Sequence, residues 1–317
     1  MALDEATVAL LAQLAESGTK PLHEMTPEEA RQLTASLGAL YGPGPEMGHV
    51  EEQTVTSGEG SFAVRVLVPN DRPRAVIVYY HGGGWVIGAI DEFDTLGRQL
   101  AQRTGAAVVL VDYRLAPEHR YPAAAEDAWA ALEWAQAHLA DIAGGPVPLV
   151  VAGDSAGGNL AAIVAQRALD AGGPEVALQV LVYPVTDADV NNTSYSDPAN
   201  QLMLNRDSMI WFWDLYAPDV ASRANPDASP ARAGVLSGLP PAVLLTAEHD
   251  VLRDEGEAYA ARLAEAGVAV SHRRFDGQMH GFFTMVNLLP GSAAGIDYVV
   301  AEIDARLAAA PTPHPPA

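Results

Sequence analysis

Hydrophobic residues along this chain recur in short runs rich in valine and leucine. Six of these runs are almost continuously apolar, which is typical of parallel strands covered on both faces of a sheet. Two earlier runs alternate apolar and polar residues around the turn-forming segment 57–60, and this pattern predicts a hairpin at the sheet edge. The expected strands are 50–57, 62–69, 75–80, 107–113, 148–153, 178–184, 242–248 and 268–275.

Stretches with helical character lie between these apolar runs. Regular alternation of buried strands and helices predicts a doubly wound α/β sheet with right-handed crossovers. In such sheets ligands bind at the carboxyl ends of the strands, so functional residues are expected there. The expected helices are 92–103, 123–140, 156–171, 253–266 and 293–309.

Two segments fall outside this alternation. Two amphipathic helices are expected near 4–17 and 26–37, and a long interruption later in the chain contains a helical stretch at 206–216. We expect both segments to meet as a cap over the active edge of the sheet. The predicted division is cap helices 1–45, core 46–184, cap insertion 185–239, core 240–310 and a disordered, proline-rich tail 311–317.

Composition excludes several classes of function. The formal net charge is −22, which argues against a nucleic acid or an anionic membrane as partner. The chain contains no cysteine, so disulfides and thiolate chemistry are excluded, and Lys20 is its only lysine. No apolar run reaches the roughly 18 residues of a membrane span, and the acidic N-terminus lacks a basic signal region. We therefore expect a cytoplasmic protein.

The pentapeptide Gly153-Asp154-Ser155-Ala156-Gly157 follows an expected buried strand and opens an expected helix. This strand–turn–helix setting is typical of a nucleophile elbow, in which a serine sits in a strained turn between small neighbours. The helix N-terminus also favours negative charge beside the serine. A glycine-lined turn with a serine cap is the alternative, and the residues described next argue against it.

A run of three glycines, His81-Gly82-Gly83-Gly84-Trp85, follows the strand 75–80. Acyl transfer needs backbone N–H groups aimed at the oxyanion, and glycines leave those groups unobstructed. We assign Gly83 and Gly84 as donors, together with the amide of Ala156. His81 precedes the nucleophile and is expected to fix the loop.

The acid and the base are expected after the nucleophile, in that order. Asp250 is the first acidic residue after the strand 242–248, and His280 follows the last expected strand. The other candidate histidines fit poorly: His249 adjoins the acid, His272 lies within a strand and His314 lies in the tail. Ser155, Asp250 and His280 are therefore the predicted catalytic residues.

Other residues are candidates for the substrate pocket. Met209, Phe212 and Trp213 share one helix face and would either line an acyl pocket or pack the cap against the core. Trp85 and Phe282, next to the glycine run and the histidine, are further candidates. The segment 112–119 contains acidic and basic residues, and we interpret it as a rigid support for the glycine run.

The ordered motifs HGGGW, DYRLAPEH, GDSAGGN, HDVLRDE and MHGF resemble those of the bacterial hormone-sensitive-lipase family of esterases, over about residues 60–285. The resemblance implies an α/β-hydrolase fold with an eight-stranded, mostly parallel sheet, helices on both faces and a helical cap. It also implies hydrolysis of short- to medium-chain carboxylic esters without a metal or cofactor, and GDSAGG places the chain near the family IV subgroup with aspartate before the nucleophile. Similar proteins usually have proline where this chain has Val251, so the turn after the acid is expected to be less restricted.

Two other functions stay open on sequence grounds. An amidase or peptidase would use the same triad, and plant gibberellin receptors are similar to this family but lack the working histidine. The presence of His280 argues against a non-catalytic binding protein. A homodimer is also left open.

Overall fold

The computed structural model describes residues 2–58 and 60–309. Its centre is one eight-stranded sheet with the strand order β1-β2-β4-β3-β5-β6-β7-β8. The first two pairings, β1–β2 and β2–β4, are antiparallel and all later ones are parallel, so the predicted edge hairpin and α/β-hydrolase sheet are confirmed. The strands are β1 (His49–Ser57), β2 (Gly60–Val68), β3 (Val76–Tyr80), β4 (Ala107–Asp112), β5 (Leu149–Asp154), β6 (Val176–Val182), β7 (Ala242–His249) and β8 (Val270–Met279).

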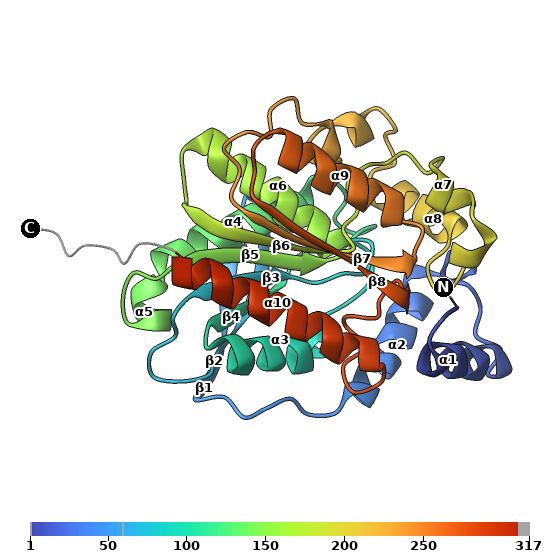
Figure 1. The fold of residues 1–317 in the computed structure, drawn as a ribbon, viewed down its shortest axis with the longest axis horizontal. Coiled ribbons are helices and arrows are strands. Elements are labelled where there is room, and N and C mark those ends of the chain that lie inside the picture. Colours follow the sequence, from blue (N-terminus) through green and yellow to red (C-terminus); the bar gives the residue numbers. More distant parts are fainter. Residues whose placement is uncertain (1, 59, 310–317) are drawn as a thin grey trace, which may run out of the picture.

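Helices cover both faces of this sheet (Figure 1). Helices α3 and α10 pack on one face with one buried apolar cluster, and α4, α6 and α9 pack on the other face with a second cluster. The bounds are α3 (Ile90–Thr104), α4 (Ala123–Ala137), α5 (Leu139–Ala143), α6 (Ala156–Ala171), α9 (Arg253–Glu265) and α10 (Pro290–Ala309). The central strands β3 and β5 are buried along their whole length because both of their faces are covered.

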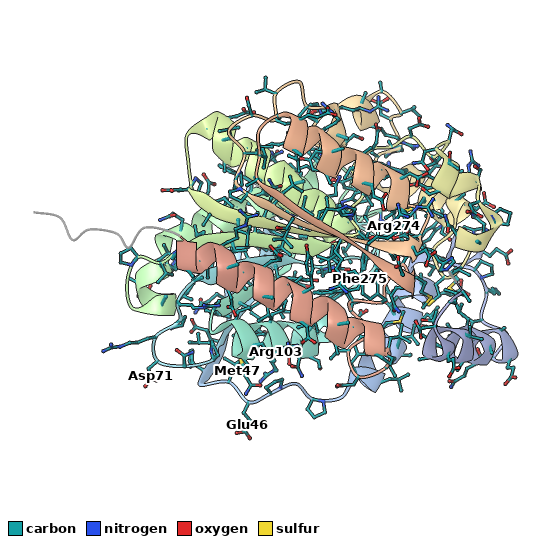
Figure 2. The ribbon with its side chains drawn as sticks, viewed as in Figure 1. Glu46, Met47, Asp71, Arg103, Arg274 and Phe275 are labelled. Atoms are coloured by element: carbon teal, nitrogen blue, oxygen red, sulfur yellow. The ribbon has the colours of Figure 1, made fainter. Side chains whose placement is uncertain are left out.

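Consecutive side chains of β8 illustrate this division. Arg274 pairs with Glu257 of α9, whereas Phe275 is buried against Phe282 and Tyr298 on the other side (Figure 2). Because strand side chains alternate between faces, neighbouring residues contact different helix layers.

One helix prediction was wrong in detail. The expected helix 123–140 is two helices, because α4 ends at Ala137 and α5 begins at Leu139. His138 lies between them with φ −108° and ψ 15°, outside the helical region, and its ring nitrogen Nδ1 bonds to the Trp134 carbonyl. The backbone amide of His138 donates to the same carbonyl, so α4 ends with both groups of His138 bonded to its last turn.

Most of the remaining elements, including α1, α2, α7 and α8, gather at the end of the sheet where the parallel strands finish (Figure 1). The expected N-terminal helices and the helix of the insertion are all present, and α8 contacts η1. The predicted tail, 311–317, lies outside the described residues. These elements are α1 (Glu5–Glu16), η1 (Leu22–Glu24), α2 (Pro27–Gly38), η2 (Ala39–Tyr41), α7 (Thr193–Ser196), η3 (Pro198–Asn200), α8 (Arg206–Tyr216), η4 (Ser222–Ala224) and η5 (Pro230–Arg232).

Within the described ranges, none of the helices has both the length and the apolar character needed to cross a bilayer.

Candidate active site

Ser155 occupies the tight turn between β5 and α6. Its backbone has φ 54° and ψ −118°, a conformation that is strained for a residue with a side chain. A Cβ atom on Gly157 would lie 1.9 Å from the Tyr80 carbonyl oxygen, and one on Gly153 would lie 2.3 Å from backbone atoms of Gly157. Both positions therefore require glycine, and the turn holds the serine at the end of the strand.

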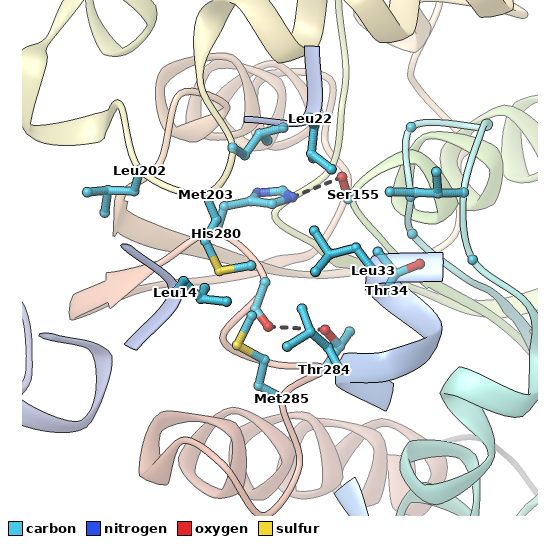
Figure 3. A pocket seen from close by; sticks show the side chains of 18 of the residues that line it. Leu14, Leu22, Leu33, Thr34, Ser155, Leu202, Met203, His280, Thr284 and Met285 are labelled. Carbon is cyan, nitrogen blue, oxygen red and sulfur yellow. Dashed lines mark hydrogen bonds between the residues drawn. The ribbon is translucent and has the colours of Figure 1, made fainter. Parts of the chain in front are cut away.

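His280 connects the serine to a buried carboxylate. Its Nε2 lies 3.0 Å from Oγ of Ser155 (Figure 3). Its Nδ1 lies 2.7 Å from Oδ2 of Asp250. Asp250 is completely buried. The ring of Tyr183 packs beside the imidazole with the ring centres 4.5 Å apart. The three residues predicted from sequence order thus meet at one edge of the sheet.

The turn that carries Asp250 is held by hydrogen bonds. The Leu252 amide donates to Oδ1 of Asp250 at 2.9 Å, and the Ser194 hydroxyl donates to the Val251 carbonyl at 2.6 Å. Val251 itself is fully buried. These contacts restrict the turn where a proline would otherwise fix φ, so the departure at Val251 leaves the carboxylate in place.

The glycine run lies beside Ser155. Gly83 and Gly84 line the same cavity as the serine, with φ 111° and 58°. A Cβ on Gly83 would lie 2.1 Å from the Ile87 carbonyl oxygen, and one on Gly84 would lie 2.2 Å from the Phe212 ring. In the described part of the chain, no group accepts a hydrogen bond from the amides of Gly83, Gly84 or Ala156. These donors are available to a ligand.

Asp154 links the serine turn to the glycine run, a role that the sequence did not reveal. Its Oδ1 accepts hydrogen bonds from the Tyr79 hydroxyl at 2.8 Å and from the Gly82 amide at 3.0 Å. Burial raises the pKa of the Asp154 carboxyl to about 6, although the hydrogen bond from Tyr79 lowers it. The only sequence signal was its place directly before the nucleophile.

Ser155 and His280 open onto a cavity of about 560 Å³. Most of its wall is apolar and comes from the N-terminal helices, the insertion and the loop after β8 (Figure 3). An apolar chain attached to a scissile group would be buried there. The apolar lining comprises Leu11, Leu14, Leu22, Leu33, Leu37, Ile87, Phe93, Leu202, Met203, Leu204, Met209, Phe212 and Met285.

Three of the five predicted pocket residues do not line this cavity. Met209 and Phe212 do, but Trp213 does not, and its ring centre lies 4.8 Å from that of Trp85. Trp85 is completely buried, and Phe282 packs in the core under β8. The expected face of α8 is therefore divided, because Met209 and Phe212 contact the cavity while Trp213 packs the cap onto the body.

The segment 112–119 supports the glycine run, as predicted. The Tyr113 hydroxyl donates to the His81 carbonyl at 2.8 Å, and its ring stacks on His81. Arg114 forms an ion pair at 2.7 Å with the fully buried Asp127.

Arg31 of α2 attaches a cap helix to the same region. Its guanidinium donates to the carbonyls of Val86 and Ala116 at 2.9 and 3.0 Å and pairs with Glu118 at 2.7 Å. Hydrogen bonding to Arg31 lowers the pKa of Glu118 to about 2.

Among residues 2–58 and 60–309, no group of three or more His, Cys, Asp or Glu side chains could hold a metal ion.

A strained serine, a histidine–carboxylate pair and unpaired amides from the glycine run and the start of α6 are the arrangement expected of a serine hydrolase. Residues 77–284 match the family model described as the alpha/beta hydrolase fold. The chain belongs to this family, and its predicted place in the hormone-sensitive-lipase-like branch is confirmed.

The chain is similar to several esterases. It is 43% identical to carboxylesterase NlhH of Mycobacterium tuberculosis over 257 residues, covering 78% of this chain and 80% of the relative. It is 36% identical to the ethyl acetate hydrolase of Pseudomonas putida, covering 95% and 98%. The crystal structure of a thermostable esterase from Pseudomonas putida ECU1011 superposes with a TM-score of 0.89 at 38% identity, covering 96% and 98%.

Proposed function

We propose that this protein is a carboxylesterase that hydrolyses short- to medium-chain carboxylic esters. The observation that carries the proposal is the hydrogen-bonded series Asp250–His280–Ser155, whose serine faces an apolar cavity. The similarity to proteins named carboxylesterase and ethyl acetate hydrolase supports the same reaction. The cavity volume of about 560 Å³ suits a small ester rather than a polymer.

In the proposed mechanism, Ser155 Oγ attacks the ester carbonyl carbon while its proton passes to Nε2 of His280. Asp250 holds the imidazole in the required tautomer and stabilises its positive charge. The amides of Gly83 and Gly84, with that of Ala156, bind the oxyanion.

The attack forms a tetrahedral intermediate. Its collapse breaks the carbon–oxygen bond to the alcohol, which leaves with the proton from His280. A water molecule then attacks the acyl-enzyme with His280 again accepting a proton. The acid is released, and the proton returns to Ser155.

The test compares wild type with Ser155→Ala on p-nitrophenyl butyrate. Turnover should fall by about 10⁴-fold or more, because removing a triad nucleophile leaves only the contributions of the oxyanion hole and substrate binding. Ser61→Ala, on the exposed edge hairpin, is the control and should retain wild-type turnover. Undiminished turnover in Ser155→Ala, or an organophosphate adduct on a different residue, would contradict the mechanism.

A matched p-nitroanilide separates esterase from amidase action. We expect ester cleavage to be faster, and comparable rates on both substrates would favour an amidase.

Two finer points are also proposed. We propose that residues 1–45 and 185–239 act together as a cap, supported by their shared contribution to the cavity wall. A cytoplasmic location rests on composition alone, and fractionation of cells that produce the protein tests it. The homodimer stays a hypothesis, tested by light scattering of the purified protein.

A further inference from the structure

One wall of the active-site cavity is polar. Thr34 of α2, Tyr41 of η2 and Glu92 of α3 line the same cavity as Ser155 and His280. We call Thr34, Tyr41 and Glu92 the polar wall. It contrasts with the leucine and methionine side chains that form most of the lining. The proposed esterase mechanism assigns no role to any of its three members.

Glu92 is a partly buried carboxyl group without a cationic partner in the described part of the chain. Its neighbours on α3 differ, since Asp91 and Asp94 both pair with Arg65, at 2.6 and 3.1 Å. Those carboxylates hold the helix to strand β2. Glu92 makes no such ion pair in the described part of the chain, and it lines the cavity instead.

The surroundings of Glu92 disfavour its charge. Burial raises the pKa of the Glu92 carboxyl to about 7, although a hydrogen bond with the Thr34 side chain lowers it. The negative charges of Asp112 and Asp91 also raise the pKa. A carboxyl group in this setting gains from any hydrogen-bond donor that enters the cavity.

The polar wall is fixed by packing rather than by charge. Helix α2 approaches so closely that a Cβ on Gly38 would lie 3.2 Å from Cβ and Cγ of Glu92. The Asn287 side chain donates to the Tyr41 carbonyl at 2.6 Å and secures the backbone there. Burial and the charge of Glu92 raise the pKa of Tyr41 to about 12, so its hydroxyl keeps its proton.

The other ionisable groups along the cavity lie elsewhere in the site. Asp154 and His280 belong to the catalytic region, and Lys20 lies on an exposed turn after α1. Glu92 is thus the acidic group of the cavity wall that neither the catalytic geometry nor an ion pair accounts for.

We propose that the polar wall is a specificity subsite that binds a hydrogen-bond donor on the substrate, such as a hydroxyl group, at a distance from the scissile ester. The inference rests on the proposed esterase function, because the subsite belongs to the same cavity. A carboxylate accepts hydrogen bonds only, and a carboxylic acid both donates and accepts, so a hydroxyl group is satisfied in either state. A methyl group in the same place leaves the carboxyl group unpaired and desolvated.

The test uses pairs of esters that differ in one terminal group. On the acyl side, p-nitrophenyl 6-hydroxyhexanoate is compared with p-nitrophenyl heptanoate, and the 6-aminohexanoate ester provides a cationic donor. On the alcohol side, 6-hydroxyhexyl acetate is compared with heptyl acetate by titration of released acid. The measured quantity is the ratio of kcat/KM within each pair, which is independent of the fraction of folded enzyme.

Wild type should prefer the hydroxyl member of at least one pair by about 10-fold, the discrimination expected from one unpaired buried polar group. Glu92→Leu should abolish or invert the preference. Glu92→Gln should keep the hydroxyl preference, because the amide oxygen still accepts, and should lose any preference for the ammonium ester. Glu133→Leu, at an exposed site on α4, is the control and should leave the ratios unchanged.

The outcomes separate the two proposals. Rapid ester hydrolysis with ratios near one in wild type, or ratios unaltered in Glu92→Leu, would overturn the subsite and leave the esterase function intact. Absence of ester hydrolysis in wild type would overturn both. A preference confined to the ammonium ester would support a donor subsite and identify the donor as a cation.

Discussion

Replacement of Asp154 tests whether this carboxyl group holds the glycine run against the serine turn. Asp154→Ala removes the acceptor of two buried donors, the Tyr79 hydroxyl and the Gly82 amide. Each unpaired buried donor costs about 1–3 kcal/mol, so the free energy of unfolding should fall by about 2–6 kcal/mol. Because Gly82 adjoins the proposed oxyanion donors, kcat should also fall by about 10²-fold, comparable to the loss of one donor.

Asp154→Asn is the matched control, because it keeps an oxygen where Oδ1 lies. Both hydrogen bonds can be retained, so kcat should stay within a few-fold of wild type. The assays are kcat on p-nitrophenyl butyrate and urea unfolding followed by circular dichroism. Equal kcat values for Asp154→Ala and wild type would refute the proposed positioning role, as would an Asn variant as impaired as the Ala variant.

The raised pKa of Asp154 adds a pH dependence with a definite sign. The carboxyl group has a pKa of about 6 in the folded protein and an ordinary value of 3.8. The folded state therefore binds its proton more tightly, and the resulting stabilisation is present below pH 4 and lost as the pH rises through 6. At about 1.4 kcal/mol for each pH unit, the loss amounts to about 3 kcal/mol. Wild type should thus lose stability relative to Asp154→Asn between pH 4 and 6, and a constant difference across this range would contradict the assignment.

Two further substitutions test other parts of the site. Asp250→Asn should lower kcat by about 10⁴-fold with little change in KM, because an amide no longer enforces the imidazole tautomer of His280. A loss of this size is typical of a serine triad deprived of its carboxylate. Steady-state kinetics on p-nitrophenyl butyrate measure kcat, and a loss below about tenfold would count against the triad. Arg114→Met should lower the free energy of unfolding by about 3 kcal/mol, because the fully buried carboxylate of Asp127 loses its cationic partner. Arg103→Met removes a partner from the largely exposed ion pair with Asp297 and should cost about 1 kcal/mol or less in the same urea titration. Equal losses in the two variants would contradict this reasoning.

The features that could be predicted from the sequence are those set by local pattern. Continuous apolar runs predicted the parallel strands, and the start of α6 followed from the elbow pentapeptide. The order of Ser155, Asp250 and His280 along the chain was enough to predict that their side chains meet. All three residues follow strands that end at the same edge of the sheet.

Features that depend on packing across the sheet could not be predicted. Trp85 and Trp213 are aromatic residues near the site, but their rings turn toward each other and away from the cavity. The helical periodicity places Trp213 on the same face as Phe212, but it does not show which side chains of that face line the cavity and which pack against the core. Likewise, nothing local to Glu92 showed that it would lack the arginine that its neighbours share.

The attachment of Arg31 has a consequence for how a substrate enters. Its side chain joins α2 to two carbonyls beside the glycine run, so swinging that helix outward would break several bonds at once. Helix α1 hydrogen-bonds to the core through Asp4, which contacts Gly277 and Gln278, and its other contacts there are apolar. We expect substrate entry and product release to displace α1 and the turn that follows it. Helix α2 should stay in place as the fixed side of the entrance.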